Sequence, residues 1–149
     1  MKTIYYLEDD WRYAKAVISE LKEKAAKSHF EWEIKRIPTE SEFIAIFEKI
    51  KSGTLPRPDA FILDIMVRYA TPNSNDKMDE ETSMPPYDRA GIRCAELINR
   101  DDPHRPIILF TILDEEDLPP EVRQIKKITY LAKEPNMDVL FKSLCAALE

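Results

Sequence analysis

Residues 60–64 read AFILD, a run of four apolar residues that ends in an acid. An unbroken apolar run of this length is typical of a strand covered on both faces, as strands are in a parallel sheet. Residues 4–8 read IYYLE and repeat the pattern, with two further acids behind them. Both segments predict buried strands whose carboxyl ends carry negative charge.

Strand and helix patterns alternate along the rest of the chain. Asp10 and Thr39 are predicted N-caps, because their side-chain oxygens can accept hydrogen bonds from the free amides of a first helical turn. Pro119 and Pro120 fit the first turn of the fourth helix, and the fifth helix is predicted to bury Val139. We predict strands at residues 4–7, 30–37, 60–63, 106–110 and 128–132. We predict helices from the N-cap Asp10 to about residue 25, at 39–52, at 90–100, over an undefined length between 114 and 127, and from about 136 onward.

This order, a strand followed by a helix five times over, predicts an α/β fold with an open, doubly wound parallel sheet. Parallel strands must be joined by crossover connections, and these are usually helices. In such a sheet the ligand binds beyond the carboxyl ends of the strands. The residues that follow each strand are therefore the candidates for a functional site.

The length of 149 residues predicts a single domain over residues 1–149. Residues 67–88 interrupt the periodic pattern, because they are polar, acidic and rich in proline. A stretch of about 20 residues without structure is unusual inside a compact domain and is often functional. We predict that residues 67–88 form a mobile loop inserted after the third strand.

Composition excludes several classes of function. No apolar run approaches the ~18 residues of a membrane span, and a net charge of −6 without a basic face argues against a nucleic-acid partner. The two glycines, Gly53 and Gly91, cannot form a glycine-rich phosphate loop. Cys94 and Cys145 show no metal-binding spacing, and no secretory signal precedes the first strand. These features predict a cytoplasmic protein with reduced thiols.

Polar residues follow four of the five predicted strands. Glu8 and Asp9 follow the first strand, Asp64 the third, Thr111 the fourth and Lys133 the fifth. Clustered carboxylates repel one another unless a cation lies between them, and oxygen ligands favour Mg²⁺. A hydroxyl and an ammonium beside that ion suit a phosphoryl group, and a carboxylate can itself be the nucleophile that forms an aspartyl phosphate.

In this order the motifs resemble those of response regulator receiver domains. The resemblance rests on residues 7–10 (LEDD), residues 63–66 (LDIM), Thr111, and Lys133 that lies 22 residues beyond it. It extends over nearly the whole chain and implies a flavodoxin-like sheet with strand order 2-1-3-4-5. It also implies a single-domain regulator, not an enzyme beyond its own phosphorylation and dephosphorylation. A histidine kinase or phosphotransfer protein would supply the phosphoryl group, and the output would be a changed affinity for an unknown downstream protein.

The resemblance assigns the metal site to four residues and makes Asp64 the phosphoacceptor. Asp9 would bind Mg²⁺ directly together with Asp64, Glu8 would act through water, and the carbonyl of Met66 would complete the protein ligands. Of these four residues, only Asp64 would also react with the phosphoryl group.

The resemblance assigns three further roles. Thr111 would donate a hydrogen bond to a phosphoryl oxygen, and Lys133 would pair with the phosphoryl group or with Asp64. Tyr130 lies where the family has an aromatic rotamer switch, which would move together with Thr111.

The sequence departs from the family pattern at three places. Ile112 follows Thr111 where the family has a small residue, Glu134 separates Lys133 from Pro135, and residues 67–88 would lie beside Asp64. These departures leave open a degenerate receiver-like interaction module that does not cycle phosphate. A metal-dependent phosphohydrolase on a similar sheet is disfavoured, because such enzymes need a second acid where Met66 stands.

Overall fold

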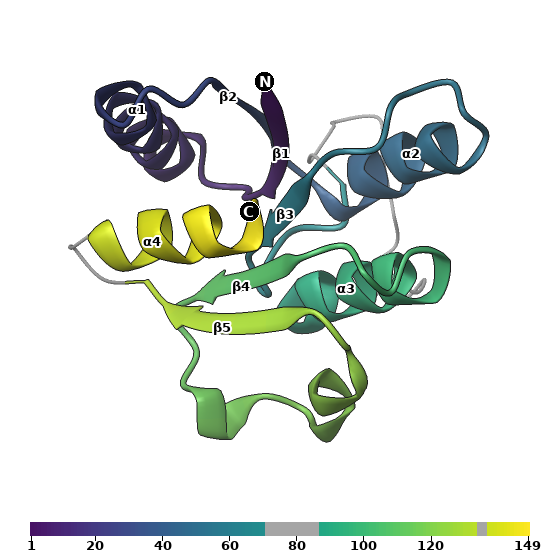
Figure 1. The fold of residues 1–149 in the computed structure, drawn as a ribbon. Coiled ribbons are helices and arrows are strands. Elements are labelled where there is room, and N and C mark those ends of the chain that lie inside the picture. Colours follow the sequence, from purple (N-terminus) through teal and green to yellow (C-terminus); the bar gives the residue numbers. More distant parts are fainter. Residues whose placement is uncertain (71–86, 134–136) are drawn as a thin grey trace.

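Five parallel strands form one sheet at the centre of the computed structural model, which describes residues 1–70, 87–133 and 137–149 (Figure 1). They are β1 (Lys2–Leu7), β2 (Trp32–Ile37), β3 (Ala60–Leu63), β4 (Ile107–Thr111) and β5 (Ile128–Ala132). Their order across the sheet is β2-β1-β3-β4-β5, and every neighbouring pair is parallel. The predicted α/β fold and its strand order are confirmed.

In the described ranges, four α-helices cover the two faces of this sheet. They are α1 (Trp11–Lys27), α2 (Glu40–Lys51), α3 (Ala90–Asp101) and α4 (Asp138–Ala147). The same ranges contain three short 3₁₀ helices: η1 (Tyr87–Arg89), η2 (Glu115–Asp117) and η3 (Pro120–Gln124). Figure 1 shows α1 and α4 on one face and α2 and α3 on the other. Both faces are therefore buried, which explains the unbroken apolar runs of the central strands.

Side chains alternate between two hydrophobic cores along each strand. On β1, Ile4 and Tyr6 pack with α1 and α4, whereas Tyr5 and Leu7 pack with α2 and α3. This period of two follows from the pleat of a strand. It directs the next even-numbered residue, Glu8, toward the α1–α4 side.

The predicted N-caps are confirmed. The Asp10 carboxylate accepts hydrogen bonds from the amides of Arg12 and Tyr13, each at 3.1 Å. The Thr39 hydroxyl accepts one from the amide of Glu42 at 3.2 Å. Both contacts satisfy amides that have no partner within their own helix, so they fix where α1 and α2 begin.

The connection between β4 and β5 differs from the helix predicted for residues 114–127. It contains only η2 and η3, which lie on either side of Pro119. Pro119 and Pro120 have no amide hydrogen to donate, and the run of acids at 114–117 disfavours a longer helix through like-charge repulsion. Pro120 does lie in the first turn of η3, as predicted, but the connection holds two short 3₁₀ helices, with Pro119 between them, in place of one α-helix.

The last helix and the predicted insert also differ in detail. Val139 is 49% exposed rather than buried, because the first turn of α4 directs it outward. Most of the predicted loop at 67–88 lies outside the described residues. Of its beginning, Val67 is fully buried, and the carbonyls of Arg68 and Tyr69 accept hydrogen bonds from the first amides of α2. Residues 67–69 therefore belong to the packed structure.

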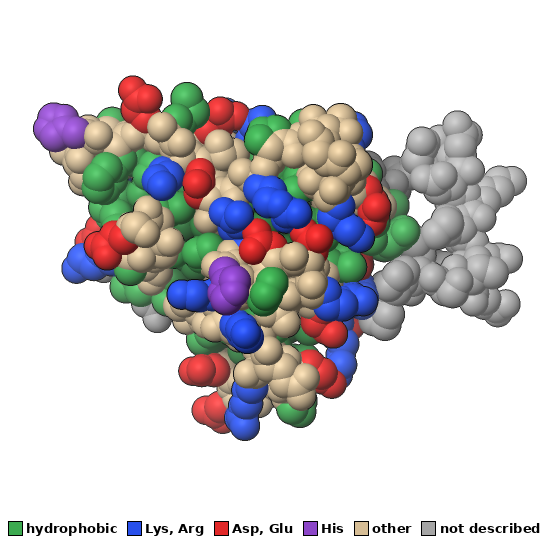
Figure 2. Space-filling model, turned by 45° about the vertical axis from the view of Figure 1, so that its right-hand side comes forward, with side chains coloured by type: hydrophobic (Ala, Val, Ile, Leu, Met, Phe, Trp, Pro, Cys, Tyr) green, Lys and Arg blue, Asp and Glu red, His purple; other side chains and the backbone are tan. Residues whose placement is uncertain are grey.

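Charged side chains of both signs lie on the surface of the described residues. Figure 2 shows acidic and basic side chains interspersed on the face in view. Several form ion pairs, such as Arg57 with Asp101 at 2.6 Å and Lys35 with Glu33 at 3.1 Å. Within residues 1–70, 87–133 and 137–149, no helix has both the length and the apolar character needed to cross a bilayer.

Gly91, in the first turn of α3, lets this helix approach the end of β3. Its amide donates a hydrogen bond to the carbonyl of Ile65 at 2.9 Å. A Cβ at this position would lie 2.2 Å from the backbone oxygen of Asp64 and 2.7 Å from Cα of Ile65. Only a residue without a side chain fits, so Gly91 sets how closely α3 supports the backbone of Asp64.

We expect Gly91→Ala to displace the Asp64 backbone and to lower the free energy of unfolding by about 1–3 kcal/mol, as overpacking does elsewhere. Urea unfolding measures the loss, and amide chemical shifts of residues 64 and 65 report the displacement. Gly53→Ala is the matched control, because a Cβ there has open space and only its φ of +81° is unfavourable. Unchanged amide shifts at residues 64 and 65 in Gly91→Ala would contradict this prediction.

Candidate functional site

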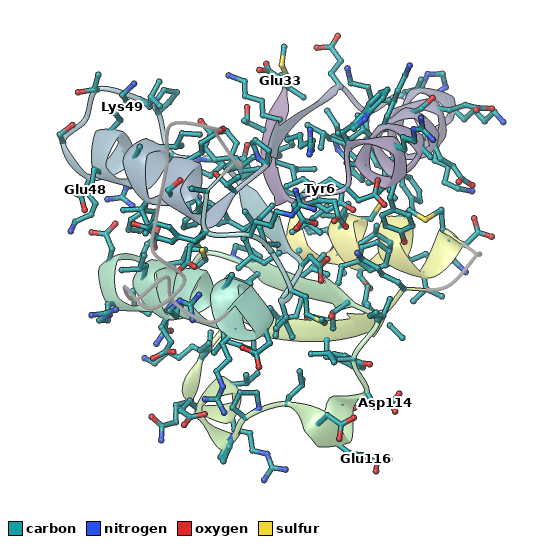
Figure 3. All side chains as sticks on the ribbon, turned by 180° about the vertical axis from the view of Figure 1, so that it is seen from behind. Tyr6, Glu33, Glu48, Lys49, Asp114 and Glu116 are labelled. Atoms are coloured by element: carbon teal, nitrogen blue, oxygen red, sulfur yellow. The ribbon has the colours of Figure 1, made fainter. Side chains whose placement is uncertain are left out.

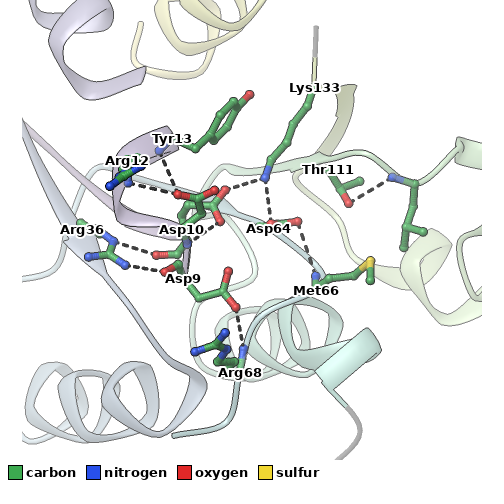
Figure 4. A network of polar contacts seen from close by, with 12 residues as sticks. Asp9, Asp10, Arg12, Tyr13, Arg36, Asp64, Met66, Arg68, Thr111 and Lys133 are labelled. Carbon is green, nitrogen blue, oxygen red and sulfur yellow. Dashed lines mark hydrogen bonds and ion pairs between the residues drawn. The ribbon is translucent and has the colours of Figure 1, made fainter. Parts of the chain in front are cut away.

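The carboxyl ends of three strands bring Glu8, Asp64 and Lys133 together on the α1–α4 side of the sheet (Figure 4). The Lys133 ammonium lies 2.5 Å from Oε1 of Glu8 and 2.9 Å from Oδ2 of Asp64. Glu8 is 1% and Asp64 5% exposed. The predicted meeting of these three residues is confirmed, although 125 positions separate the first from the last.

Burial and charge compete within this cluster. Burial raises the pKa of Glu8 above its ordinary value of 4.5, and the neighbouring Asp64 carboxylate adds to that, although Lys133 acts in the opposite direction. For Lys133, burial favours loss of the proton, but the carboxylates of Asp64 and Glu8 outweigh it and the net pKa is raised. Lys133 therefore stays charged at neutral pH and stabilises two carboxylates that would otherwise repel each other.

Asp9 belongs to the same loop as Glu8, but it faces another part of the chain. Its Oδ2 accepts a hydrogen bond from the amide of Arg68 at 3.2 Å, four residues beyond Asp64. The guanidinium of Arg36, on β2, donates to the carbonyls of Glu8 and Asp9, at 2.8 Å each. The loop after β1 is thus held both from β2 and from the loop after β3 (Figure 4).

Thr111 and Tyr130 both form hydrogen bonds with the backbone of Leu113. The fully buried Thr111 hydroxyl accepts a hydrogen bond from the amide of Leu113 at 3.3 Å. The carbonyl of Leu113 accepts one from the Tyr130 hydroxyl at 2.5 Å. Ile112, between them, is 71% exposed. The two residues assigned to a switch are therefore coupled through the backbone after β4.

The predicted ligand residues fit a hard divalent cation in their chemistry, because Glu8, Asp9 and Asp64 offer only oxygen donors. Met66 lies beside them, and its amide donates to Oδ1 of Asp64 at 3.4 Å. In the part of the chain that the structure describes, no three His, Cys, Asp or Glu side chains are arranged to hold a metal. The cation between Glu8 and Asp64 in this arrangement is the ammonium of Lys133.

Three residues that shape the site were not predicted. Gly91 supports Asp64, Arg36 holds the acidic loop, and the Tyr13 ring lies 4.5 Å from the Lys133 ammonium. The scarcity of glycine in this chain was a signal for Gly91, because it stands just after a loop that leaves a strand. No pattern in the sequence marks Arg36 or Tyr13, since their roles depend on which elements are neighbours in space.

Comparison with known proteins gives structural matches only: no family model and no curated protein matches the chain. The response regulator TrrA from Thermotoga maritima, solved with Mg²⁺ and BeF, is 23% identical and has a TM-score of 0.66. The match covers 99% of this chain and 100% of the TrrA chain. The receiver domain of the Francisella response regulator 1452 is 16% identical, with a TM-score of 0.67 and coverage of 99% and 97%. A receiver domain protein from Clostridium thermocellum is 17% identical, again with a TM-score of 0.67 and coverage of 99% and 94%. The chain therefore has the fold of response regulator receiver domains.

Replacement of Lys133 by methionine should destabilise the protein in a pH-dependent manner. Without the ammonium, Glu8 and Asp64 are buried like charges, so the pKa of Glu8 rises further and the loss at pH 7 is about 3–5 kcal/mol. The folded state then binds a proton that the unfolded state has released, and its stability falls as the pH rises above 4.5, the ordinary pKa of Glu8.

Urea unfolding of Lys133→Met and wild type at pH 5 and pH 7 tests this sign. The deficit should be larger at pH 7. Lys35→Met is the matched control, because its partner Glu33 is 42% exposed and the pair contributes at most about 1 kcal/mol. A deficit of equal size at both pH values would contradict the coupling to Glu8.

Proposed function

We propose that this chain is a response regulator receiver that accepts a phosphoryl group on Asp64 and thereby changes its affinity for another protein. The observation that carries the proposal is the Lys133 ammonium, which bridges Glu8 and Asp64 at 2.5 and 2.9 Å in a buried corner beyond the strand ends. The receiver fold raises the weight of this observation, because TrrA, which shares the fold, was solved with Mg²⁺ and BeF.

In the proposed reaction an Asp64 carboxylate oxygen forms a bond to the phosphorus of a phosphohistidine. The bond from phosphorus to the imidazole nitrogen breaks, and its electron pair stays on that nitrogen. Lys133 is already hydrogen-bonded to Asp64, so its ammonium can neutralise charge on the incoming oxygens. The Thr111 hydroxyl would donate to one of these oxygens and give up its present contact with the amide of Leu113.

The residues proposed to hold Mg²⁺ are Asp9 and Asp64 directly through their carboxylates, Glu8 through water, and Met66 through its carbonyl. A bound Mg²⁺ would offset the negative charge that carboxylates and phosphoryl oxygens share. The hydrogen bonds from Arg36 and Arg68 fix the loop that carries two of these acids, so the protein holds them in place before an ion arrives.

The same contacts suggest how the signal would spread. Movement of Thr111 toward a phosphoryl group would release the amide of Leu113, whose carbonyl holds the Tyr130 hydroxyl. Tyr130 lies on β5, the edge strand of the sheet. Phosphorylation would therefore alter the surface around β4 and β5, where a partner protein could detect the change.

A receiver-like module that no longer cycles phosphate is the second candidate. It is favoured by the absence, within the described ranges, of a group of three acids arranged for a metal. In that case Lys133 would act permanently as the structural counterion of Glu8 and Asp64. The two candidates predict opposite results in a phosphorylation experiment.

Incubation with Mg²⁺ and acetyl phosphate should add one phosphoryl group to the wild-type chain, as measured by intact mass. Asp64→Asn should remain unmodified, and so should wild type in the presence of EDTA. Asp114→Asn is the control, because this exposed acid lies in the connection after β4 and should not affect the reaction. No added mass in wild type, or equal addition in Asp64→Asn, would favour the module without phosphate chemistry.

Three exposed apolar side chains lie at the same edge of the sheet as the cluster. Trp11 is 55%, Ile112 71% and Val139 49% exposed, and they follow β1, β4 and β5 along the chain. Exposed apolar side chains near the strand ends suit docking of a protein donor better than access by a small molecule alone.

We expect Ile112→Asp to slow phosphoryl transfer from a histidine kinase about tenfold or more, because a charge would replace an exposed apolar side chain directly after Thr111. Transfer from acetyl phosphate should change little. Phe30→Asp is the matched control, since this exposed residue lies before β2, at the opposite edge of the sheet. Equal slowing with both donors would argue against a docking role for Ile112.

A further inference from the structure

The Lys133 ammonium has a third neighbour besides Glu8 and Asp64. Its nitrogen lies over the Tyr13 ring, 4.5 Å from the centroid, and the lysine side chain is only 12% exposed. A cation at this distance from an aromatic face is attracted by the ring quadrupole, most strongly where water is excluded. Figure 4 shows the Tyr13 ring beside Lys133 in the same polar network.

Two independent contacts fix the Tyr13 ring. Its backbone amide donates to the N-cap carboxylate of Asp10 at 3.1 Å, which places Tyr13 in the first turn of α1. Its ring stacks on Phe110, with centroids 6.3 Å apart and an interplanar angle of 27°. Phe110 is buried and directly precedes Thr111 on β4. The ring is thus held between the acidic loop and the strand that carries the Thr111 hydroxyl.

A lysine side chain has a flexible four-carbon stem and a point charge without preferred direction. Hydrogen bonds to Glu8 and Asp64 hold its nitrogen in the present arrangement, but both bonds must change if Asp64 gains a phosphoryl group. The aromatic face is independent of those two carboxylates, so it remains in place when they change partner.

We propose that Tyr13 is a positioning residue, whose ring face keeps the Lys133 ammonium at the site before and after Asp64 is modified. The second part of this proposal, the role after Asp64 is modified, rests on the proposed function. The first part, the role before modification, concerns the unmodified protein alone. The ring, and not its hydroxyl, carries the effect. Tyr13→Phe should therefore preserve it, whereas Tyr13→Leu should abolish it.

Side-chain NMR of the unmodified protein tests the first part. The Lys133 ε-methylene and ammonium signals, assigned by their loss in Lys133→Arg, should show a ring-current shift in wild type and Tyr13→Phe and lose it in Tyr13→Leu. Phe30→Leu is the matched control, because it also removes an aromatic ring, but one that stacks on Trp32, with centroids 5.9 Å apart, instead of lying under Lys133. Lys133 signals that are the same in wild type and Tyr13→Leu would overturn the proposal.

Binding of beryllofluoride in the presence of Mg²⁺ tests the second part. Tyr13→Leu should bind about 2- to 30-fold more weakly than wild type, the range that one cation–π contact supplies, and Tyr13→Phe should bind like wild type. Equal weakening in both variants, or none in Tyr13→Leu, would overturn this part. Wild type that binds no beryllofluoride would refute the proposed function, while the NMR comparison would still decide the role of Tyr13. If Tyr13→Leu unfolds, Tyr13→Met supplies a second ring-free variant for both measurements.

Discussion

The structure of this site depends on one interaction: a single ammonium that joins two buried carboxylates from neighbouring strands. Glu8 and Asp64 follow β1 and β3, which are adjacent in the sheet, so their side chains would repel each other without a cation. Lys133 follows β5, the outermost strand, which β4 separates from β3. Its long side chain extends past the end of β4 to reach both acids. A parallel sheet makes this possible because the carboxyl ends of all its strands lie on the same side of the sheet.

The surrounding contacts determine where the acids can be. Arg36 binds two consecutive carbonyls of the acidic loop, and the Arg68 amide binds the Asp9 carboxylate. Gly91 allows α3 to contact the backbone of Asp64. Arg36 lies on β2, whereas Arg68 and Gly91 both belong to the connection between β3 and β4, so the acids are held only once β2 and this connection have packed against the ends of β1 and β3.

Much of this arrangement could be predicted from the sequence, because it follows from strand ends. Apolar runs that stop at Glu8, Asp64 and Lys133 are visible in one dimension, and the parallel sheet brings their ends together. Between residues 114 and 127 one helix was predicted, and Pro119 lies between two short 3₁₀ helices there. Val139 was predicted to be buried, but spacing alone does not show which side of a first helical turn is covered. The contact of Tyr13 with Lys133 depends on side-chain direction across three elements, which no spacing encodes.

The cluster also retains polar groups that a purely structural core would avoid. Tyr6 is fully buried, and its hydroxyl has no hydrogen-bond partner among the described residues; Figure 3 shows it inside the fold, while Asp114 and Glu116 lie at the periphery. Burial and the nearby charge of Glu8 raise its pKa, so the hydroxyl stays neutral beside the acids. Two carboxylates, one ammonium and an unsatisfied hydroxyl leave net negative charge in a buried corner, an arrangement less stable than apolar packing. Such a cost is common where the arrangement serves function, and here the charge left over by Lys133 is of the sign that attracts a further cation.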